Sequence, residues 1–403
     1  MQKMTEAKRI YCKYLYTLAD GSEPVAPGYV DYNPEDGTIL GAGRADAIPE
    51  GAEVLDGAVV PGFVNAHCHL ELSYMKGLFR RGTGMAGFID QINELRDVAP
   101  LEERLADISF ELDQMWRSGV SAMADISNCD DSFAAKAASP LYTRTFLEVF
   151  GTEPEDCDAV IKGVLELQKK AVECGLDAAP TPHACYTMSP ALVEASSAEG
   201  LKSGYLSFHS EETPEEEEMI GKGSGRLWDN RKAAGMSTPP VTGGTSLEYF
   251  VDRLAAVKPL PIKDHILLVH EVCMTEAGTE LVKRALPGAF VALCPKSNIY
   301  IHNALPPVEM LRKSGLPLTL GTDSLSSNDS LNMVEELYCL QENFAGLTLG
   351  EMLTWACLNG ARFLGKEAEL GSIGAGKKPG LVLIDHIAAD GRLTSSSASY
   401  RIV

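Results

Sequence analysis

The chain has 403 residues, of which 45% are hydrophobic and 23% are charged, proportions that are typical of a globular protein. Its formal net charge of −21 argues against a nucleic-acid-binding protein, which needs a basic surface, and against attachment to an anionic membrane. We therefore expect a small-molecule substrate, with no nucleic acid and no membrane among the partners. The length exceeds that of an ordinary single domain but suits an α/β barrel with an appendage.

Ten cysteines are scattered along the chain and none forms a Cys-x-x-Cys pair, so a zinc–thiolate site is not expected. Most of them lie within apolar runs, where a free thiol packs as a small hydrophobic group. The N-terminus has no signal-peptide core, and no stretch approaches roughly 18 uninterrupted apolar residues. The sequence thus predicts a reduced, cytoplasmic protein.

Short β-like runs punctuated by glycine and proline make up the first part of the chain. They cover Arg9–Leu15, Gly28–Tyr32, Thr38–Gly41 and Glu53–Leu55. A glycine-rich segment from Leu370 leads into another such run, Leu381–Asp385. Two β-rich ends that flank a larger middle region predict a small composite β-sandwich built from residues 1–57 and 367–403.

Between these ends, eight strand-like runs alternate with segments of helical periodicity. The runs are Val59–His69, Val120–Ser127, Tyr142–Phe150, Leu176–His183, Tyr205–Glu211, His265–Glu271, Phe290–Pro295 and Pro317–Asp323. Apolar residues recur at three- and four-residue spacing in the intervening segments, for example in Leu105–Ser118 and Asp158–Cys174. Alternating strands and helices indicate a parallel sheet, and eight such units predict a (β/α)8 TIM-like barrel over residues 58–366. A doubly wound sheet is the alternative, but no Gly-x-Gly-x-x-Gly turn follows the first strand.

Ionisable residues gather at the ends of these predicted strands. Asp323 closes the eighth run, and five of the eight histidines close others, namely His67, His69, His183, His209 and His270. Chance placement would scatter these residues over helices and surface loops. Because a barrel carries its active site at the carboxyl ends of its strands, the clustering predicts a functional site there.

A metal ion would explain the cluster. Residues i and i+2 of a strand face the same side, so His67 and His69 can aim both imidazoles at one ion. With His209 and Asp323 they would supply an N/O ligand set suited to Zn²⁺ or Fe²⁺, and we expect one divalent metal ion, with Zn²⁺ as the first choice and Fe²⁺ as the alternative, and an open position for water. The competing interpretations are a core histidine satisfied by backbone for His209 and a helix cap for Asp323.

Two further residues are candidates for proton transfer. Glu212 lies three residues after His209, where a carboxylate can take a proton from water and pass it to a leaving nitrogen. His270 ends its own strand and can stabilise the attacking hydroxide from the other side, although a structural hydrogen bond would equally occupy it. The neighbouring Glu215–Glu218 fits a solvated first turn of a helix after Pro214.

The order of these motifs resembles the amidohydrolase superfamily, in the branch of aminohydrolases that holds cytosine, guanine and S-adenosylhomocysteine deaminases. The resemblance covers nearly the whole chain, and its motifs are Pro-Gly-Phe-Val-Asn-Ala-His-Cys-His at 61–69, His-Ser-Glu-Glu at 209–212, Val-His-Glu at 269–271 and Gly-Thr-Asp-Ser at 321–324. It implies a distorted barrel, a small β-sandwich, one divalent metal ion and a homodimer.

The same resemblance assigns roles to individual residues. It implies metal ligation by His67, His69, His209 and Asp323, proton transfer by Glu212, and orientation of water or substrate by His270. No lysine ends the fourth strand, where the binuclear branch carries one, which favours a single metal ion. His183 looks like the substrate-contacting histidine of a Pro-His-Ala-Pro-Tyr motif, in which Cys185 here replaces the second proline.

The substrate is left more open. The segments 67–73, 209–215 and 321–331 resemble those of 6-amino-6-deoxyfutalosine deaminases, although Ser324 stands where that group has glycine. A benzoate-bearing substrate would require a cation in the pocket, for which Arg80, Arg81 and Arg144 are candidates by position. Each of these could instead be an ordinary surface or sheet-end arginine.

Two acidic residues complete the set of candidates. Glu71 and Glu148 could hydrogen-bond a purine or a ribose, or they could support other residues of the site. For Glu71, the first role requires that the strand stays extended beyond His69.

These features predict a metal-dependent hydrolytic deaminase of an adenine-type nucleoside or related N-heterocycle that releases ammonia. The alternative on the same scaffold is hydrolytic dechlorination or amide hydrolysis. Glu212 together with His270 favours deamination, since ammonia must be protonated to leave and chloride need not be. A non-catalytic binding protein is a further alternative, against which the full ligand set argues.

Overall fold

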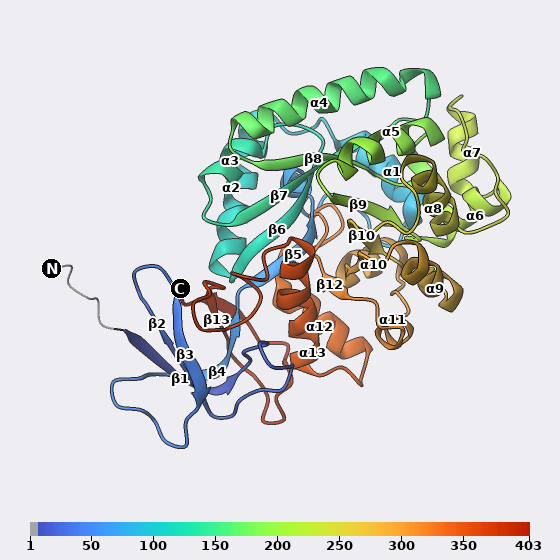
Figure 1. Ribbon diagram of the computed structural model, residues 1–403. Coiled ribbons are helices and arrows are strands. Elements are labelled where there is room, and N and C mark those ends of the chain that lie inside the picture. Colours follow the sequence, from blue (N-terminus) through green and yellow to red (C-terminus); the bar gives the residue numbers. More distant parts are fainter. Residues whose placement is uncertain (1–6) are drawn as a thin grey trace.

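Eight parallel strands form two four-stranded sheets in the computed structural model, which describes residues 7–403 (Figure 1). The first sheet has the order β5–β6–β7–β8 and the second β12–β11–β10–β9. Their bounds are β5 Phe63–Cys68, β6 Val120–Ser127, β7 Tyr142–Val149, β8 Asp177–Pro182, β9 Tyr205–Ser210, β10 His265–His270, β11 Ala289–Leu293 and β12 Leu318–Leu320. The five predicted strands between Val120 and Glu271 are confirmed to within one residue at each end, and the last two are shorter than predicted.

The outer strands of the two sheets lie side by side. An isolated parallel bridge joins Cys68 to Asp323, so β5 adjoins β12, and another joins Ala184 to His209, so β8 adjoins β9. One buried cluster also draws its side chains from strands of both sheets, among them Val64, Phe146, Leu267 and Ala292. The two sheets therefore enclose a common apolar interior.

A six-stranded mixed sheet stands beside this α/β body, and it combines both ends of the chain (Figure 1). Its order is β14–β13–β4–β1–β2–β3, with bounds β1 Lys8–Leu15, β2 Gly28–Tyr32, β3 Ile39–Arg44, β4 Glu53–Pro61, β13 Leu381–Ile384 and β14 Ser399–Arg401. Strand β13 pairs antiparallel with β4, which joins the tail to the N-terminal strands. Within residues 7–403 these six strands are hydrogen-bonded in one sheet. The first six residues of the predicted N-terminal segment lie outside the described part.

The prediction of one strand over Val59–His69 is wrong, because the chain changes sheets at Gly62. Strand β4 ends at Pro61 in the mixed sheet, and β5 begins at Phe63 in the parallel sheet. A side chain at Gly62 would meet Oγ of Ser121 at 1.9 Å and the carbonyl oxygen of Pro379 at 2.5 Å. Only glycine fits this crossing point.

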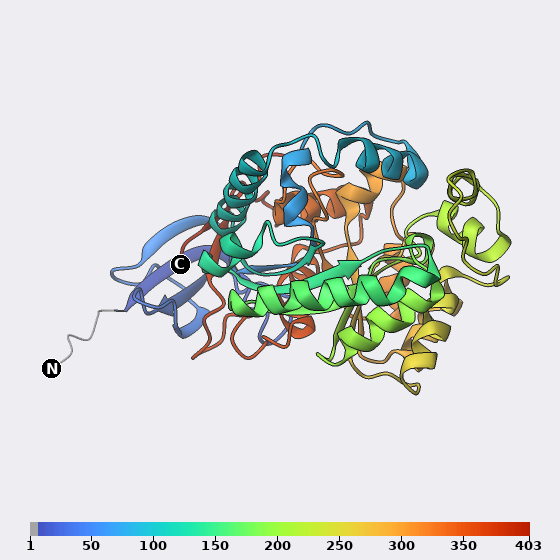
Figure 2. The same cartoon turned by 90° about the horizontal axis from the view of Figure 1, so that it is seen from above.

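Helices connect the strands and cover the parallel sheets; Figure 2 shows α4 along their outer side. The helices are α1 Gly84–Leu95, α2 Leu101–Arg117, α3 Phe133–Ala138, α4 Cys157–Glu173, α5 Pro190–Leu201, α6 Pro214–Lys222, α7 Arg226–Ala233, α8 Ser246–Val257, α9 Glu276–Ala285, α10 Pro295–His302, α11 Val308–Ser314, α12 Met333–Asn343, α13 Leu349–Leu353 and α14 Gly360–Phe363. Shorter turns are the 3₁₀ helices η1 Leu70–Met75, η2 Pro154–Asp156 and η3 Cys185–Thr187, and the π-turn η4 Thr354–Asn359. The predicted helices Leu105–Ser118 and Asp158–Cys174 correspond to α2 and α4. Among residues 7–403, none of these helices has both the length and the apolar character that a membrane crossing requires.

Candidate metal centre and active site

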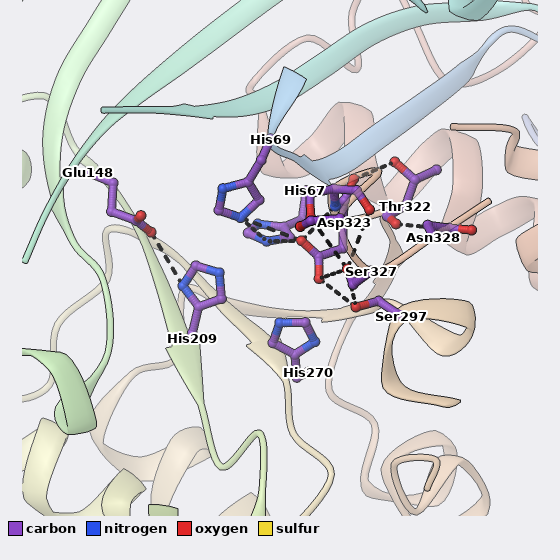
Figure 3. Close-up of polar contacts among 12 residues, drawn as sticks. His67, His69, Glu148, His209, His270, Ser297, Thr322, Asp323, Ser327 and Asn328 are labelled. Carbon is purple, nitrogen blue, oxygen red and sulfur yellow. Dashed lines mark hydrogen bonds and ion pairs between the residues drawn. The ribbon is translucent and has the colours of Figure 1, made fainter. Parts of the chain in front are cut away.

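The four predicted metal ligands meet at the carboxyl ends of the parallel strands (Figure 3). His67 lies on β5 and His69 directly follows that strand, whereas His209 lies on β9 and Asp323 follows β12. The Nε2 atoms of His67 and His69 are 3.1 Å apart and lie 3.8 and 3.5 Å from Oδ1 of Asp323. The ring centroids of His67 and His209 are 4.8 Å apart. The buried side chains form two overlapping groups of potential ligands that share His67, namely His67, His69 and Asp323, and His67, His209 and His270.

The protonation state of these rings suits a metal ion. Burial, and then the neighbouring imidazoles of His69 and His270, lower the pKa of His209 to about 3. Burial also lowers the pKa of His67 well below its usual value. The rings are therefore neutral and offer lone pairs, and no hydrogen bond occupies the buried Nδ1 of His67. This neutral donor set with one carboxylate fits Zn²⁺ or Fe²⁺.

Three serines fix the carboxylate of Asp323. Ser297 and Ser327 donate their hydroxyl protons to Oδ2 over 2.6 and 3.1 Å, and the backbone N–H of Ser324 donates to Oδ1 over 2.7 Å. Asp323 itself has a φ of +57°, a conformation that costs a non-glycine residue about 1–3 kcal/mol. Backbone strain of this kind persists only where the surrounding contacts enforce it, as the three serines do here. Sequence reasoning did not assign Ser297 or Ser327 to the site.

Glu212 lies beside this cluster and is held by hydrogen bonds. The hydroxyl of Tyr186 donates to Oε2 over 2.8 Å, and Nε2 of His270 lies 3.4 Å from Oε1. Burial by itself would raise the pKa of Glu212, but the imidazoles of His270 and His302 outweigh it and hold the pKa below its usual range. A carboxylate that is ionised in a buried site can accept a proton. Tyr186, which lies in the motif of His183, is a site residue that sequence reasoning missed.

The acidic run Glu215–Glu218 begins helix α6 as predicted, but the expectation of a solvated face is wrong. Glu216 is fully buried, and its Oε2 accepts the backbone N–H of Glu212 over 2.9 Å. Burial, and then the charge of Glu217, raise the pKa of Glu216 well above its usual value. This turn therefore holds the backbone of Glu212 in place.

His270 ends β10 with a φ of +81°, and it faces both Glu212 and the metal ligands. Its Nδ1 lies 3.0 Å from Nδ2 of Asn298, whereas its Nε2 is buried without a hydrogen-bond partner. A ring that is anchored on one side and free on the other can orient a reacting group. Asn298 is a second residue that sequence reasoning did not assign to the site.

Of the predicted substrate contacts, His183 and Glu148 line the same cavity as the catalytic candidates. The ring of His183 lies 4.5 Å from that of His209, and its Nδ1 is 2.7 Å from Oγ1 of Thr187. Oε1 of Glu148 lies 3.4 Å from Nδ1 of His209. Glu148, His183 and His209 could also surround an ion, but they share His209 with the larger cluster.

Glu71 does not face this cavity, because β5 ends at Cys68 and the 3₁₀ helix η1 replaces the expected extension of the strand. Its buried carboxylate accepts the backbone N–H groups of Asn128 and Cys129 over 2.9 and 3.2 Å. The extended strand that the proposed substrate contact of Glu71 requires is therefore absent. Glu71 instead shapes the loop that brings Asn128 into the cavity wall.

Two of the three arginines proposed as substrate contacts, Arg144 and Arg80, also lie elsewhere. Arg144 belongs to the first half of β7, so its side chain lies at the amino end of the sheet, where Nη1 is 2.9 Å from Oδ1 of Asp177 and Nη2 donates to Ser203. Arg80 is exposed, and its backbone N–H bonds to Gln91 over 2.8 Å. Neither residue is among those that line the cavity.

The cavity has a volume of about 170 Å³. Its polar end holds the histidines, Glu212 and Asp323, and apolar side chains make up much of the remaining wall, namely Leu72, Met85, Phe88, Ile89, Ile92, Phe150 and Ile301. Arg96, which directly follows α1, is the one lysine or arginine among the lining residues. Sequence reasoning missed it because no motif marks the end of this helix.

Comparison with known proteins agrees with this geometry. Residues 58–399 match the model of the amidohydrolase family. Aminodeoxyfutalosine deaminase of Deinococcus radiodurans is 29% identical over 88% of this chain and 85% of its own length. The 5-methylthioadenosine/S-adenosylhomocysteine deaminase of Moorella thermoacetica is 27% identical over 85% of this chain and 76% of its own. The structure of Helicobacter pylori aminofutalosine deaminase with methylthio-coformycin aligns over 98% of this chain and 100% of that one, with a TM-score of 0.80 and 22% identity. The chain belongs to the amidohydrolase family.

Proposed function

We propose that this protein is a metal-dependent hydrolase that removes the exocyclic amine of adenine-type nucleosides and releases ammonia. The observation that carries the proposal is the position of Glu212 and His270 beside three histidines and Asp323 at one end of a buried cavity. The names of the relatives from D. radiodurans and M. thermoacetica describe deaminases of such nucleosides.

The scaffold that we propose is one eight-stranded barrel over residues 58–366, flanked by a small β-domain from residues 1–57 and 367–403. The bridges between β5 and β12 and between β8 and β9 support closure, as does the apolar interior that both sheets share. In such a barrel the carboxyl ends of all strands surround one mouth.

The four residues His67, His69, His209 and Asp323 would hold one divalent ion, for which zinc is our first choice. When bound, this ion supplies Lewis acidity, which lowers the pKa of water and makes a hydroxide nucleophile accessible near neutral pH. The carboxylate of Glu212 would accept a proton from the attacking water, and His270 would orient the water oxygen toward the carbon that bears the amine.

Deamination then requires one carbon–oxygen bond to form and one carbon–nitrogen bond to break. Glu212 delivers the first proton of the water to the ring nitrogen. It then carries the second proton, from the oxygen added to the carbon, to the amine, so that a carbonyl forms and ammonia leaves as a neutral molecule. Tyr186 holds Oε2 of Glu212 through its hydroxyl, which leaves Oε1 toward His270. His183 and Glu148 line the part of the cavity next to these groups, where the purine would lie.

Among such nucleosides we propose 6-amino-6-deoxyfutalosine as the preferred substrate. The long apolar wall of the cavity would cover a bulky group beyond the ribose, which adenosine lacks. Hydrolytic dechlorination or amide hydrolysis remains the second candidate, and the presence of both Glu212 and His270 favours deamination over it.

An ammonia-release screen with the zinc-loaded protein tests the proposal. We expect turnover of 6-amino-6-deoxyfutalosine and lower rates with adenosine, 5′-methylthioadenosine and S-adenosylhomocysteine. Guanine, cytosine and a chlorotriazine serve as comparison substrates. Chloride release from the triazine without ammonia from any adenine nucleoside would overturn the proposal.

A further inference from the structure

We propose that Arg96 binds an anionic group at the end of the substrate remote from the metal centre, and so selects adenine nucleosides that carry a carboxylate on an apolar arm. The inference rests on the proposed deaminase function and names the substrate feature that the cavity recognises.

Within residues 7–403, Arg96 forms no ion pair, in contrast to other basic residues near the cavity, and Glu148 of the same cavity interacts with its charge only at longer range. The chain has 56 acidic and 35 basic residues, so an arginine that forms no ion pair is unusual in it. Arg81 pairs with Asp329, and Arg226 pairs with Asp90. Within residues 7–403, no carboxylate comes within ion-pair distance of the guanidinium of Arg96, which lines the cavity directly. An anionic ligand group would supply the missing partner.

A row of rings connects the metal centre to Arg96. The rings of His209 and His183 have centroids 4.5 Å apart, and those of His183 and Phe150 are 6.4 Å apart. The guanidinium carbon of Arg96 lies 5.2 Å from the centroid of Phe150. A purine that reacts beside His209 would thus place its far substituent toward Arg96.

The position of Arg96 is fixed before any ligand binds. Its backbone carbonyl accepts the hydroxyl of the buried Tyr74 over 2.5 Å, and its backbone N–H bonds to Ile92. The guanidinium lies over the ring of Phe150, a contact that restrains its plane. An arginine held in this way can bind a planar carboxylate through two parallel hydrogen bonds.

The side chains of the cavity wall next to Arg96 indicate to which kind of chemical group the anion of the substrate is attached. Phe88, Ile89 and Ile92 of α1 line it together with Phe150. An apolar arm would cover these side chains, whereas a phosphate on the ribose would leave them exposed to water. The cavity therefore favours a carboxylate on an apolar group over a nucleotide.

A neighbouring cavity offers a second route for the arm, but its cation is already paired. It shares Asn128, Glu148 and Phe150 with the first cavity and is also lined by Lys170. Nζ of Lys170 donates to Oδ2 of Asp130 over 2.8 Å. An anion there would have to compete with Asp130, so Arg96 is the better site.

The test compares Arg96→Gln with two controls, Arg80→Gln and Lys170→Gln, after each variant is shown to retain zinc and its melting temperature. The substrates are 6-amino-6-deoxyfutalosine, its methyl ester, adenosine and 5′-AMP. We expect Arg96→Gln to lower kcat/KM for the free acid by about 10- to 100-fold, mainly through KM, because charge-assisted hydrogen bonds are lost. The ester and adenosine should change less than about three-fold, as should all substrates with the two controls.

Three results would overturn the inference: equal losses on the acid and adenosine, a selective loss in Lys170→Gln instead, or a wild-type preference for 5′-AMP over the acid. Failure of the proposed function is a separate result, because the wild-type protein would then deaminate neither adenosine nor the ester. Arg96→Lys, which keeps the charge but not the planar fork, should fall between the wild type and Arg96→Gln on the acid.

Discussion

The side chain of Glu212 is surrounded by groups that fix both its charge and its direction. Tyr186 donates to one carboxylate oxygen and His270 faces the other, and the backbone N–H of Glu212 is bound by Glu216. Each of these contacts comes from a different element, so the position of the carboxylate depends on the fold as a whole. This arrangement makes Glu212 the residue on which proton transfer depends in the proposed reaction.

Replacement of Glu212 by glutamine should therefore abolish most turnover without loss of the metal. We expect Glu212→Gln to lower kcat by about 10²- to 10⁴-fold, since the amide cannot accept and return the proton. Metal content and melting temperature should match the wild type. Glu215→Gln, whose carboxylate binds the N–H of Ala86 and lies outside the cavity lining, is the matched control and should change kcat less than about three-fold. Near wild-type turnover in Glu212→Gln would refute the assigned role.

The catalytic candidates could be predicted from the sequence because each lies at or just beyond the end of a strand. The same rule would have excluded Arg144, which is the third residue of β7 and hence lies at the amino end. Arg96 could not be predicted, because its place in the cavity depends on how α1 packs over Phe150. Contacts between distant loops leave no local pattern in the sequence.

At the level of elements, the break at Gly62 separates strand β4 of the six-stranded mixed sheet from strand β5 of the first parallel sheet. The apolar run continues through this glycine without any change in pattern, so the sequence predicts one strand where the structure has two. The separation comes from Ser121 and Pro379, which lie far away in sequence and leave no room for a side chain. Strand β14 was also not predicted, because its three residues are too few to show an alternation of apolar and polar side chains.

Substitution of Gly62 tests this view of the crossing point. Gly62→Ala should lower the free energy of unfolding by about 1–3 kcal/mol, because the new methyl group overlaps Ser121 and Pro379. Gly163→Ala within α4 is the control, since no atom lies within 4 Å of the added carbon. It should raise stability by about 0.5–1 kcal/mol through helix propensity. Denaturant unfolding measures both, and equal stability of the two variants would contradict the crossing-point account.

The first turn of α6 should make stability depend on pH. The folded protein binds the proton of Glu216 more tightly than the unfolded chain does, because burial raises the pKa in the folded state. This contribution is complete below the unfolded pKa and is lost as the pH rises, with a slope of at most about 1.4 kcal/mol per pH unit. Glu216→Gln keeps a side-chain oxygen that can accept the backbone N–H of Glu212. The melting temperature of this variant should fall less than that of the wild type as the pH rises from 6 to 9. The exposed Glu166→Gln should retain the wild-type slope, and an unchanged slope in Glu216→Gln would contradict the burial argument.

Across the whole molecule, two four-stranded sheets bring ligands from distant parts of the chain to one place. His67 and Asp323 are separated by most of the α/β region, yet the bridge between Cys68 and Asp323 joins their strands. The alternation of strands and helices predicted this class of fold, and strand order follows from right-handed connections. The depth of the cavity and the identity of its apolar wall could not be predicted, because they depend on loops packed above the strands.

The same packing should protect nearly all thiols from reagents. The ten cysteines are free, and Cys174 alone is exposed. Among the partly exposed ones, burial raises the pKa of the Cys339 thiol to about 12 and that of Cys129 higher still. A disulfide reagent at pH 8 should therefore modify one thiol per chain rapidly, and Cys174→Ser should remove this phase. Denaturation should expose all ten, whereas several fast thiols in the native protein would contradict the described packing.

The central claim, hydrolytic deamination that depends on a metal ion, is tested most directly by turnover in ¹⁸O-labelled water. With zinc-loaded protein and 6-amino-6-deoxyfutalosine, we predict one ¹⁸O atom in the product for each ammonia released, measured by mass spectrometry and an ammonia assay. Removal of the metal should abolish both signals, and zinc should restore them together. Ammonia without ¹⁸O in the product, or full turnover after metal removal, would contradict the account.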